Sequence, residues 1–390
     1  MARHYLDHAS TSRLRPEARD AMVAVLDGVG FDGLLPADPS RIHAEGMAAR
    51  VALEQAREQV AAWLGARPRE VVFTSGATEA IVTATWGVVR DHDGPAHVVV
   101  SAVEHSAVRE ASAAATDATG GSVTVVGADR WGRIDPEEVA GAIRPDTALV
   151  HVQWGNHEVG TRQPVAEVVA GCRARGVLVH VDAAQAAGHD PIAFDTLGAD
   201  LLSVSGHKVG GPPGTGALLV RRGLRVTPLL VGGDQERARR AGLENVPALA
   251  GFGACAALLA DPAQVEAEAR AAVALTRRVL DAVPDLDGVT VYGDPQDRLP
   301  HLVCLGIAGI EPQAVLLGLD QAGIAAHSGS ACASEGLEDS PVLAAMGVDA
   351  HRSLRISVGW PSTDADVDAL LDALPTIIGR LRALGRAAES

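Results

Sequence analysis

Residues 200–208 read DLLSVSGHK, an apolar run that passes directly into a polar turn and ends on a lysine. The GGPPG of residues 210–214 follows almost at once and keeps the backbone tight at this point. Lys208 is therefore expected at the end of a buried strand, where a lysine amine can attack a carbonyl carbon. The competing interpretation is a surface lysine beside an ordinary turn. These nine residues alone do not distinguish it from a reactive lysine, so the other motifs of the chain are needed.

Length and charge describe a compact globular protein. The 390 residues are enough for two domains of ordinary size and a large core. A net charge of −16 argues against non-specific binding to nucleic acid or to anionic membranes. No apolar run reaches the roughly 18 residues that a membrane span needs, and the N-terminal residues turn polar at once, unlike a signal peptide. We therefore expect a cytoplasmic protein.

The four cysteines are widely spaced and form no CxxC pair, so neither a disulfide framework nor a metal site is expected. Cys172, Cys255 and Cys304 are expected to be small buried hydrophobes. Cys332 differs, because the AHSGSACASEG of residues 326–336 surrounds it with small and polar residues that have no apolar periodicity. We expect Cys332 to lie on a mobile loop.

Seven short apolar runs follow one another between residues 71 and 220. Helical stretches such as 78–90 and 165–175 separate several of them. Apolar runs that alternate with helices are typical of a mostly parallel sheet with both faces covered, so an α/β fold is expected. Ligands of such sheets bind at the carboxyl ends of the strands. The runs are 71–73, 97–101, 122–126, 148–153, 177–181, 201–204 and 216–220.

Polar residues stand directly after these runs and are expected to meet at one edge of the sheet. The TSGATE of residues 74–79 opens a helix, where free amides and hydroxyls suit a phosphate. Each residue alone is unspecific, since an aspartate after a strand often caps a helix and a lone histidine is usually packed in the core. Together they supply what pyridoxal phosphate requires, namely an amine for an imine bond, an acid for the pyridine nitrogen and a phosphate site. The other members of this set are His105, Asn156, Asp182, Gln185, Ser205, His207 and Lys208.

The pattern changes near Pro262, where a long helix leaves the sheet region. We predict a large cofactor-binding domain over residues 16–260. A smaller α+β domain is expected from residues 1–15 and 261–390, and it carries Cys332. Its expected elements are helices at 263–283, 311–323 and 364–385 and strands at 301–307 and 353–358.

Six motifs in this order resemble those of the pyridoxal-phosphate-dependent cysteine desulfurases in the class V aminotransferase family. The likeness runs from the YLDHA of residues 5–9 to the C-terminal helix. It implies the type I fold of pyridoxal-phosphate-dependent transferases, with a mostly parallel seven-stranded large domain. The cysteine segment is similar to that of the subgroup with a long, mobile loop. The motifs are FTSGATE (73–79), DAAQ (182–185), SGHK (205–208), GGDQER (232–237), SGSAC (328–332) and LRIS (354–357).

The resemblance also implies a role for each site residue. Lys208 binds the cofactor covalently and moves protons, and Cys332, as a thiolate, takes the sulfur of L-cysteine as a persulfide and leaves L-alanine. Arg355 and Asn156 bind the substrate, and the planar guanidinium holds its carboxylate. His105 stacks on the cofactor ring and assists proton transfer. The further cofactor contacts are Asp182 at the pyridine nitrogen, Asn156 and Gln185 at the ring oxygen, and Ala77, Thr78, Ser205 and His207 at the phosphate.

Members of this family are homodimers that pass sulfur to an acceptor protein, so both partners are expected here. Residues 232–245 would reach the neighbouring active site. Leu243 stands where most members have a threonine, which removes roughly 0.5–1.5 kcal/mol of hydrogen bonding to the neighbouring phosphate. We expect weaker cofactor binding and a specialised paralogue that feeds a dedicated sulfur pathway. The other departures near the site are Asp38, residues 80–82, His157 and Asp234.

Two other functions stay open. Another class V lyase, acting on selenocysteine or another β-substituted amino acid, needs Lys208 but no nucleophilic thiol. A sulfur-transfer adaptor that has lost efficient cofactor binding is the alternative outside the enzymes, and Leu243 favours it. The sequence does not identify the sulfur acceptor.

Overall fold

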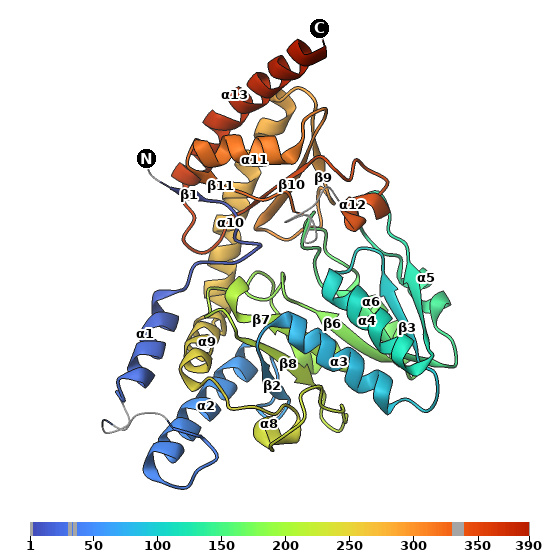
Figure 1. Cartoon of the computed structure of the whole chain (residues 1–390), viewed down its shortest axis with the longest axis vertical. Coiled ribbons are helices and arrows are strands. Elements are labelled where there is room, and N and C mark those ends of the chain that lie inside the picture. Colours follow the sequence, from blue (N-terminus) through green and yellow to red (C-terminus); the bar gives the residue numbers. More distant parts are fainter. Residues whose placement is uncertain (1–2, 30–32, 34–36, 330–338, 390) are drawn as a thin grey trace.

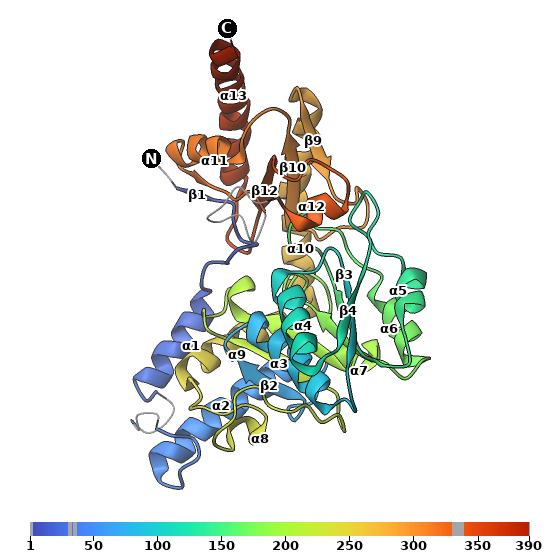
Figure 2. The same cartoon turned by 45° about the vertical axis from the view of Figure 1, so that its right-hand side comes forward.

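The computed structural model describes residues 3–29, 33, 37–329 and 339–389. Figures 1 and 2 show a large part built on a central sheet and a smaller part stacked on it along the long axis. The helix α10 (Pro262–Ala282) connects them, since its Val265 packs in the core of the large part and its Leu275 in that of the small part. The boundary expected after residue 260 falls just before this helix and stays a prediction.

All seven predicted apolar runs are strands of one sheet, whose order is β2-β8-β7-β6-β5-β3-β4. The strands from β7 to β4 pair in parallel, whereas β8 runs antiparallel to β2 and β7. The predicted α/β fold with a mostly parallel sheet is confirmed. The strands are β2 (Val71–Thr74), β3 (His97–Ser101), β4 (Ser122–Val126), β5 (Thr147–Gln153), β6 (Leu178–Asp182), β7 (Leu201–Ser205) and β8 (Gly216–Val220).

Helices cover both faces of this sheet, which explains why its inner strands are apolar throughout rather than alternating. Val98 and Val100 of β3 pack with α3 and α4, whereas Val99 packs with the helices of the opposite face. A short 3₁₀ turn, η1 (Gly206–Lys208), follows β7 directly. The helices of the large part are α1 (Pro16–Leu26), α2 (Ala44–Trp63), α3 (Ala77–Asp91), α4 (Ser106–Thr119), α5 (Pro136–Ala142), α6 (Val165–Arg173), α7 (Phe194–Leu197), α8 (Gln235–Ala238) and α9 (Val246–Leu259).

The small part contains an antiparallel sheet in the order β12-β10-β9 and a parallel pair formed by β1 and β11. Leu6, near the N-terminus, packs in the same core as side chains from α10, α11 and α13. The LRIS motif lies in the fully buried strand β12, and its Arg355 contacts the large part through a hydrogen bond to the His157 carbonyl. The elements after α10 are η2 (Val283–Asp285), β9 (Val289–Tyr292), β10 (Leu302–Ile307), α11 (Pro312–Gln321), β11 (Ile324–Ala325), α12 (Pro341–Ala345), β12 (Ser353–Ser357) and α13 (Asp364–Glu389), and β1 is His4–Tyr5.

The turn at α8 holds three consecutive non-glycine residues in the left-handed region. Glu236, Arg237 and Ala238 have φ values of 49°, 59° and 62°, a conformation that costs roughly 1–2 kcal/mol for each L-residue. A buried ion pair stabilises it, because the Glu236 carboxylate accepts hydrogen bonds from Arg57 at 2.6 and 2.8 Å and from the Phe73 amide at 2.9 Å. The predicted dimer segment is thereby anchored to α2 and β2.

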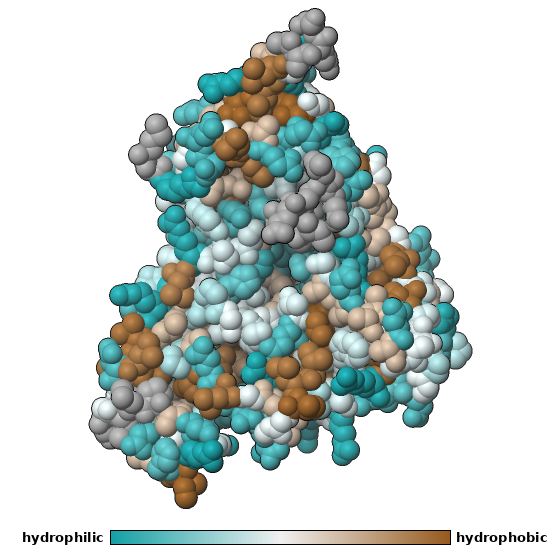
Figure 3. All heavy atoms as spheres, viewed as in Figure 1, coloured by the Kyte–Doolittle hydropathy of each residue, from teal (hydrophilic) through white to brown (hydrophobic). Residues whose placement is uncertain are grey.

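In the described part of the chain no single helix is long and apolar enough to cross a bilayer, although α9 and α10 meet the criterion together across a bend of 84°. Figure 3 shows separate hydrophobic patches on a largely hydrophilic face, one of them at the end formed by α11 and α13. Leu317 and Leu384 are exposed there.

Candidate active site

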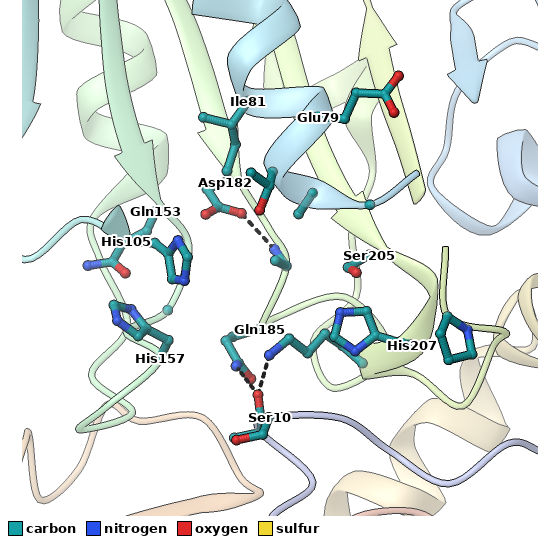
Figure 4. A pocket seen from close by; sticks show the side chains of 18 of the residues that line it. Ser10, Glu79, Ile81, His105, Gln153, His157, Asp182, Gln185, Ser205 and His207 are labelled. Atoms are coloured by element: carbon teal, nitrogen blue, oxygen red, sulfur yellow. Dashed lines mark hydrogen bonds between the residues drawn. The ribbon is translucent and has the colours of Figure 1, made fainter. Parts of the chain in front are cut away.

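A cavity of about 580 Å³ lies at the carboxyl ends of β5, β6 and β7, beside the first turn of α3. Figure 4 shows His105, Gln153 and His157 on one side of it and Ser205 and His207 on the other. The predicted residue Cys332 lies outside the described residues. The structure brings most of the other predicted site residues together around this cavity, namely Ala77, Thr78, His105, Asp182, Gln185, Ser205, His207, Lys208 and Arg355.

Lys208 lies in η1, directly after β7, as expected for a lysine at a strand end. It is the only lysine in the sequence. Its ammonium group donates a hydrogen bond to the carbonyl oxygen of Ala9. Burial and the nearby Arg355 lower the pKa of Lys208 to about 8, against the opposing charges of Asp7 and Asp182. Near neutral pH the chain therefore presents a larger share of uncharged, nucleophilic amine than an exposed lysine does.

Asp182 is the last residue of β6 and points into the centre of the cavity (Figure 4). Its Oδ1 accepts hydrogen bonds from the Ala184 amide at 3.0 Å and from the Ser203 hydroxyl at 3.3 Å. Burial raises the pKa of this carboxyl group above its ordinary value, although Ala184, His157 and Ser203 act against that rise. A buried carboxylate of this kind is stabilised by a cationic partner. The protonated nitrogen of a pyridine ring fits this requirement.

The corner of the cavity at α3 fits a phosphate. The helix begins at Ala77, and the amides of its first turn have no carbonyl partner within the helix. The Ser205 Oγ atom is buried and has no hydrogen-bond partner among the described residues. Ser75, Thr78 and His207 line the same cavity. An anion that accepts hydrogen bonds from these groups would satisfy them.

His105 follows β3 and caps α4, since its Nδ1 atom accepts a hydrogen bond from the Ala107 amide at 3.1 Å. Its ring meets that of His157 edge to face, with the centroids 5.0 Å apart. Burial lowers the pKa of His105 to about 3, and His157, Lys208 and Arg109 add to the effect. A neutral aromatic ring in the cavity wall can stack on a flat cofactor.

Asn156 does not line the cavity, in contrast to its predicted contacts with the cofactor and the substrate. Its Oδ1 accepts hydrogen bonds from the amides of Glu158 and Val159, both at 2.8 Å, and its Nδ2 donates to the Val103 carbonyl at 3.1 Å. These bonds hold the loop after β5 in shape, and they use the side chain that was expected to face the ligand. The next residue, His157, lies in the cavity wall instead.

Arg355 enters the cavity from β12 and is bound by the N-terminal segment. Its guanidinium donates to Asp7 at 3.1 Å, to the Ser10 hydroxyl at 2.7 Å and to the His157 carbonyl at 2.8 Å. Gln185 contacts the same segment, because its Nε2 donates to the Ala9 carbonyl at 2.8 Å. Sequence reasoning missed Ser10, Gln153 and His327, which also line the cavity. The available signal for Gln153 was its position as the last residue of β5, at the edge where the other site residues lie.

Acidification below pH 6.5 is expected to destabilise the folded protein. The unfolded chain has ordinary histidine pKa values near 6.5 and binds more protons than the folded chain below that pH, so the free energy of unfolding falls. A fully buried histidine such as His151 contributes a loss of about 2 kcal/mol at pH 5 by this linkage. Burial is the largest cause of the lowered pKa at each of these histidines. The pKa in the folded protein is about 3 for His105 and His151 and about 4 for His8, His189 and His207.

Urea unfolding at pH 8 and pH 5 measures this difference. Glu104 and Asp182 oppose the trend, since burial raises the pKa of both carboxyl groups, to about 8 for Glu104, and the folded form gains these protons first on acidification. The five histidines act in the other direction and outnumber them. The variant His151→Gln should lose less stability between the two pH values than the parent protein. Equal free energies of unfolding at pH 8 and pH 5 would contradict the assignment of buried neutral histidines.

Among the residues described, no three or more His, Cys, Asp or Glu side chains are placed to hold a metal ion. The chain matches the Aminotransferase class-V family over residues 4–370. It is 39% identical over 385 residues to the cysteine desulfurase of Trichormus azollae, with 97% of this chain and 94% of that protein covered. It is 41% identical over 383 residues to the cysteine desulfurase of Gluconacetobacter diazotrophicus, with the same two coverages. A solved structure of a NifS-like protein superimposes with a TM-score of 0.88 at 30% identity, covering 97% of this chain and all of the other.

Proposed function

The chain belongs to the class V aminotransferase family, and from that membership we propose that it is a pyridoxal-phosphate-dependent cysteine desulfurase. The observation that carries the proposal is that Lys208, Asp182 and the first turn of α3 line the same cavity. These groups supply the amine, the acid and the phosphate site that the cofactor needs. Relatives named cysteine desulfurase cover nearly the whole chain and support the same activity.

Bound pyridoxal phosphate supplies an electron sink for the bonds around the α-carbon of an amino acid. Lys208 would hold it covalently and move a proton at its Nζ atom once the substrate has taken its place. Asp182 would pair with the pyridine nitrogen, and His105 would stack on the ring. Gln185 has an Nε2 proton left beyond its bond to Ala9 and would donate it to the ring oxygen.

The substrate of the proposal is L-cysteine. Arg355 would hold its carboxylate, which replaces Asp7 as the anion beside the guanidinium. The thiolate of Cys332 would form a bond to the substrate sulfur and break its bond to the β-carbon, leaving L-alanine and a protein persulfide. An acceptor protein would then receive the sulfur.

The proposal also includes a homodimer and a cytoplasmic location. Val231 and Leu243 are 78% and 64% exposed beside and within residues 232–245. Exposed apolar side chains of this kind favour an interface, which supports a homodimer in which a second copy would cover them. Cys172, Cys255 and Cys304 are buried free thiols, which suits the reducing cytoplasm. The hydrophobic Ile81 in the cavity wall and the exposed Leu243 support a specialised paralogue.

The test uses purified protein loaded with cofactor, L-cysteine as substrate and the variant Cys332→Ser. The proposal expects alanine and a persulfide on Cys332 from the parent protein, and neither from the variant beyond background. Cys172→Ser is the matched control, because that thiol is buried, and burial raises its pKa to about 11. Undiminished alanine formation by Cys332→Ser would favour a β-lyase of the same family.

A further inference from the structure

His157 has a ring nitrogen that the fold leaves without a partner. The side chain lines the cavity and is 7% exposed as a residue. Its Nδ1 atom is buried and makes no hydrogen bond to any described residue. Figure 4 shows the ring beside His105, between Gln153 and Gln185. A buried polar atom without a partner is costly, so a ligand in the cavity that bonds to Nδ1 would stabilise this arrangement.

Glu158 lies behind the same imidazole. Its Oε1 atom is 3.5 Å from the Nε2 atom of His157, within ion-pair distance, and its Oε2 accepts a hydrogen bond from the Ser340 hydroxyl at 2.6 Å. Burial acts to raise the pKa of Glu158, but His157 and Ser340 outweigh it and lower the pKa below its ordinary value. The carboxylate is therefore ionised at neutral pH. A carboxylate on one ring nitrogen orients an imidazole and stabilises the positive charge that the ring acquires when its other nitrogen takes a proton.

His105 is less suited to carry a proton, although it lies next to His157. Its Nδ1 atom is used in capping α4. Burial, together with His157, Lys208 and Arg109, lowers the pKa of His105 to about 3, so the ring is neutral at neutral pH. Of these two rings, only His157 combines a carboxylate neighbour with a buried nitrogen that is not engaged.

We propose that His157, oriented by Glu158, is a second acid–base residue of the site and protonates the substrate carbon when its sulfur leaves. The inference rests on the proposed function. The attacking thiolate forms the S–S bond, the bond between the β-carbon and sulfur breaks, and its electron pair stays with the carbon. The Nδ1 proton of the imidazolium passes to that carbon, which becomes the methyl group of alanine. The persulfide S–H proton then returns to Nδ1, so protons and electrons balance without another reactant.

The experiment compares His157→Asn with the parent holoenzyme in a single turnover of L-cysteine. Persulfide on Cys332 is counted by mass spectrometry and alanine is measured in the same quenched samples. His157→Asn should keep the visible absorption of the bound cofactor and form the persulfide, while alanine release slows roughly a hundredfold, the range of lost general acid catalysis. Glu158→Gln should slow alanine release less, because the imidazole remains.

A chemical rescue separates proton transfer from a structural role. Added imidazole should restore part of the alanine release in His157→Ala, which a residue that only packs or orients would not permit. The matched control is His92→Asn, at the far end of α3 from the cavity, which should equal the parent protein. If His157→Ala does not fold, the ratio of the alanine-release rates of the parent and His157→Asn decides alone.

The inference is overturned if His157→Asn releases alanine within threefold of the parent rate, or if imidazole leaves a folded, cofactor-loaded His157→Ala unchanged. The parent protein itself decides the proposed function in the same assay. Alanine from the parent together with an unaffected His157→Asn rejects the inference and keeps the function. No alanine from the parent rejects both.

Discussion

Lys208→Ala is expected to abolish the visible absorption of bound cofactor and to lower alanine formation from L-cysteine by roughly a thousandfold or more. The physical reason is that no other side-chain amine is available, since Lys208 is the only lysine of the chain. An arginine cannot replace it, because a guanidinium stays protonated and is not a nucleophile at neutral pH. Absorption spectra of the purified protein and alanine assays measure both effects.

The single lysine also gives this prediction an unusually clean control. Borohydride reduction of the loaded parent protein followed by peptide mass spectrometry should label one internal residue, Lys208. Lys208→Arg keeps a positive charge at the position and should still lose the label and the activity. A parent protein without visible absorption after loading would instead support a sulfur-transfer adaptor that does not use the cofactor. A Lys208→Ala variant that keeps the absorption would show that Lys208 does not hold the cofactor.

Glu236→Gln is expected to lower the free energy of unfolding by about 3 kcal/mol, because it removes the fully buried charge partner of the Arg57 guanidinium and leaves only the partly exposed Glu54, 3.3 Å away. The side chains of Glu236 and Arg57 are 1% and 2% exposed, and both oxygens of Glu236 bind Arg57. Arg57 also lies over the ring of Phe73, 4.7 Å from its centroid, so the pair holds the turn against β2. Urea unfolding followed by circular dichroism measures the change.

Ala238→Gly is the matched control in the same turn. Ala238 has a φ of 62°, which glycine adopts without steric cost, so this variant should gain about 0.5–1 kcal/mol after the greater entropy of the unfolded glycine is subtracted. A loss under about 1 kcal/mol for Glu236→Gln would mean that water reaches Arg57 and that the turn is held by other contacts.

The elements of the large part were predictable because they depend on local patterns. An apolar run between turn signals forms a buried strand in this context, and all seven runs do so. Since the parallel strands end at the same edge, Asp182 and Lys208 had to come close once the runs were correctly identified. The pairing of β8 against its neighbours did not follow from the runs, because strand direction depends on how the connections cross the sheet.

The position of single side chains in loops was less predictable. Asn156 and His157 are adjacent, and a shift of one residue exchanges the side chain that holds the loop for the one that lines the cavity. The choice is made by three hydrogen bonds of Asn156, one of them to Val103 on another loop. Local propensity carries no information about that partner.

The sequence by itself determined that Lys208, Asp182 and the polar turn at α3 each follow a buried strand, because an apolar run between turn residues is a local pattern. Only the tertiary structure decided how Arg355 closes the site and which histidine has a carboxylate neighbour. Arg355 meets Asp7 and Ser10 across nearly the whole chain, and His157 meets Glu158 and His105 through a turn fixed by Asn156. Such contacts depend on packing between distant segments, and burial then sets which groups stay neutral. Lys208 keeps the place that its own short segment predicted, at the end of β7.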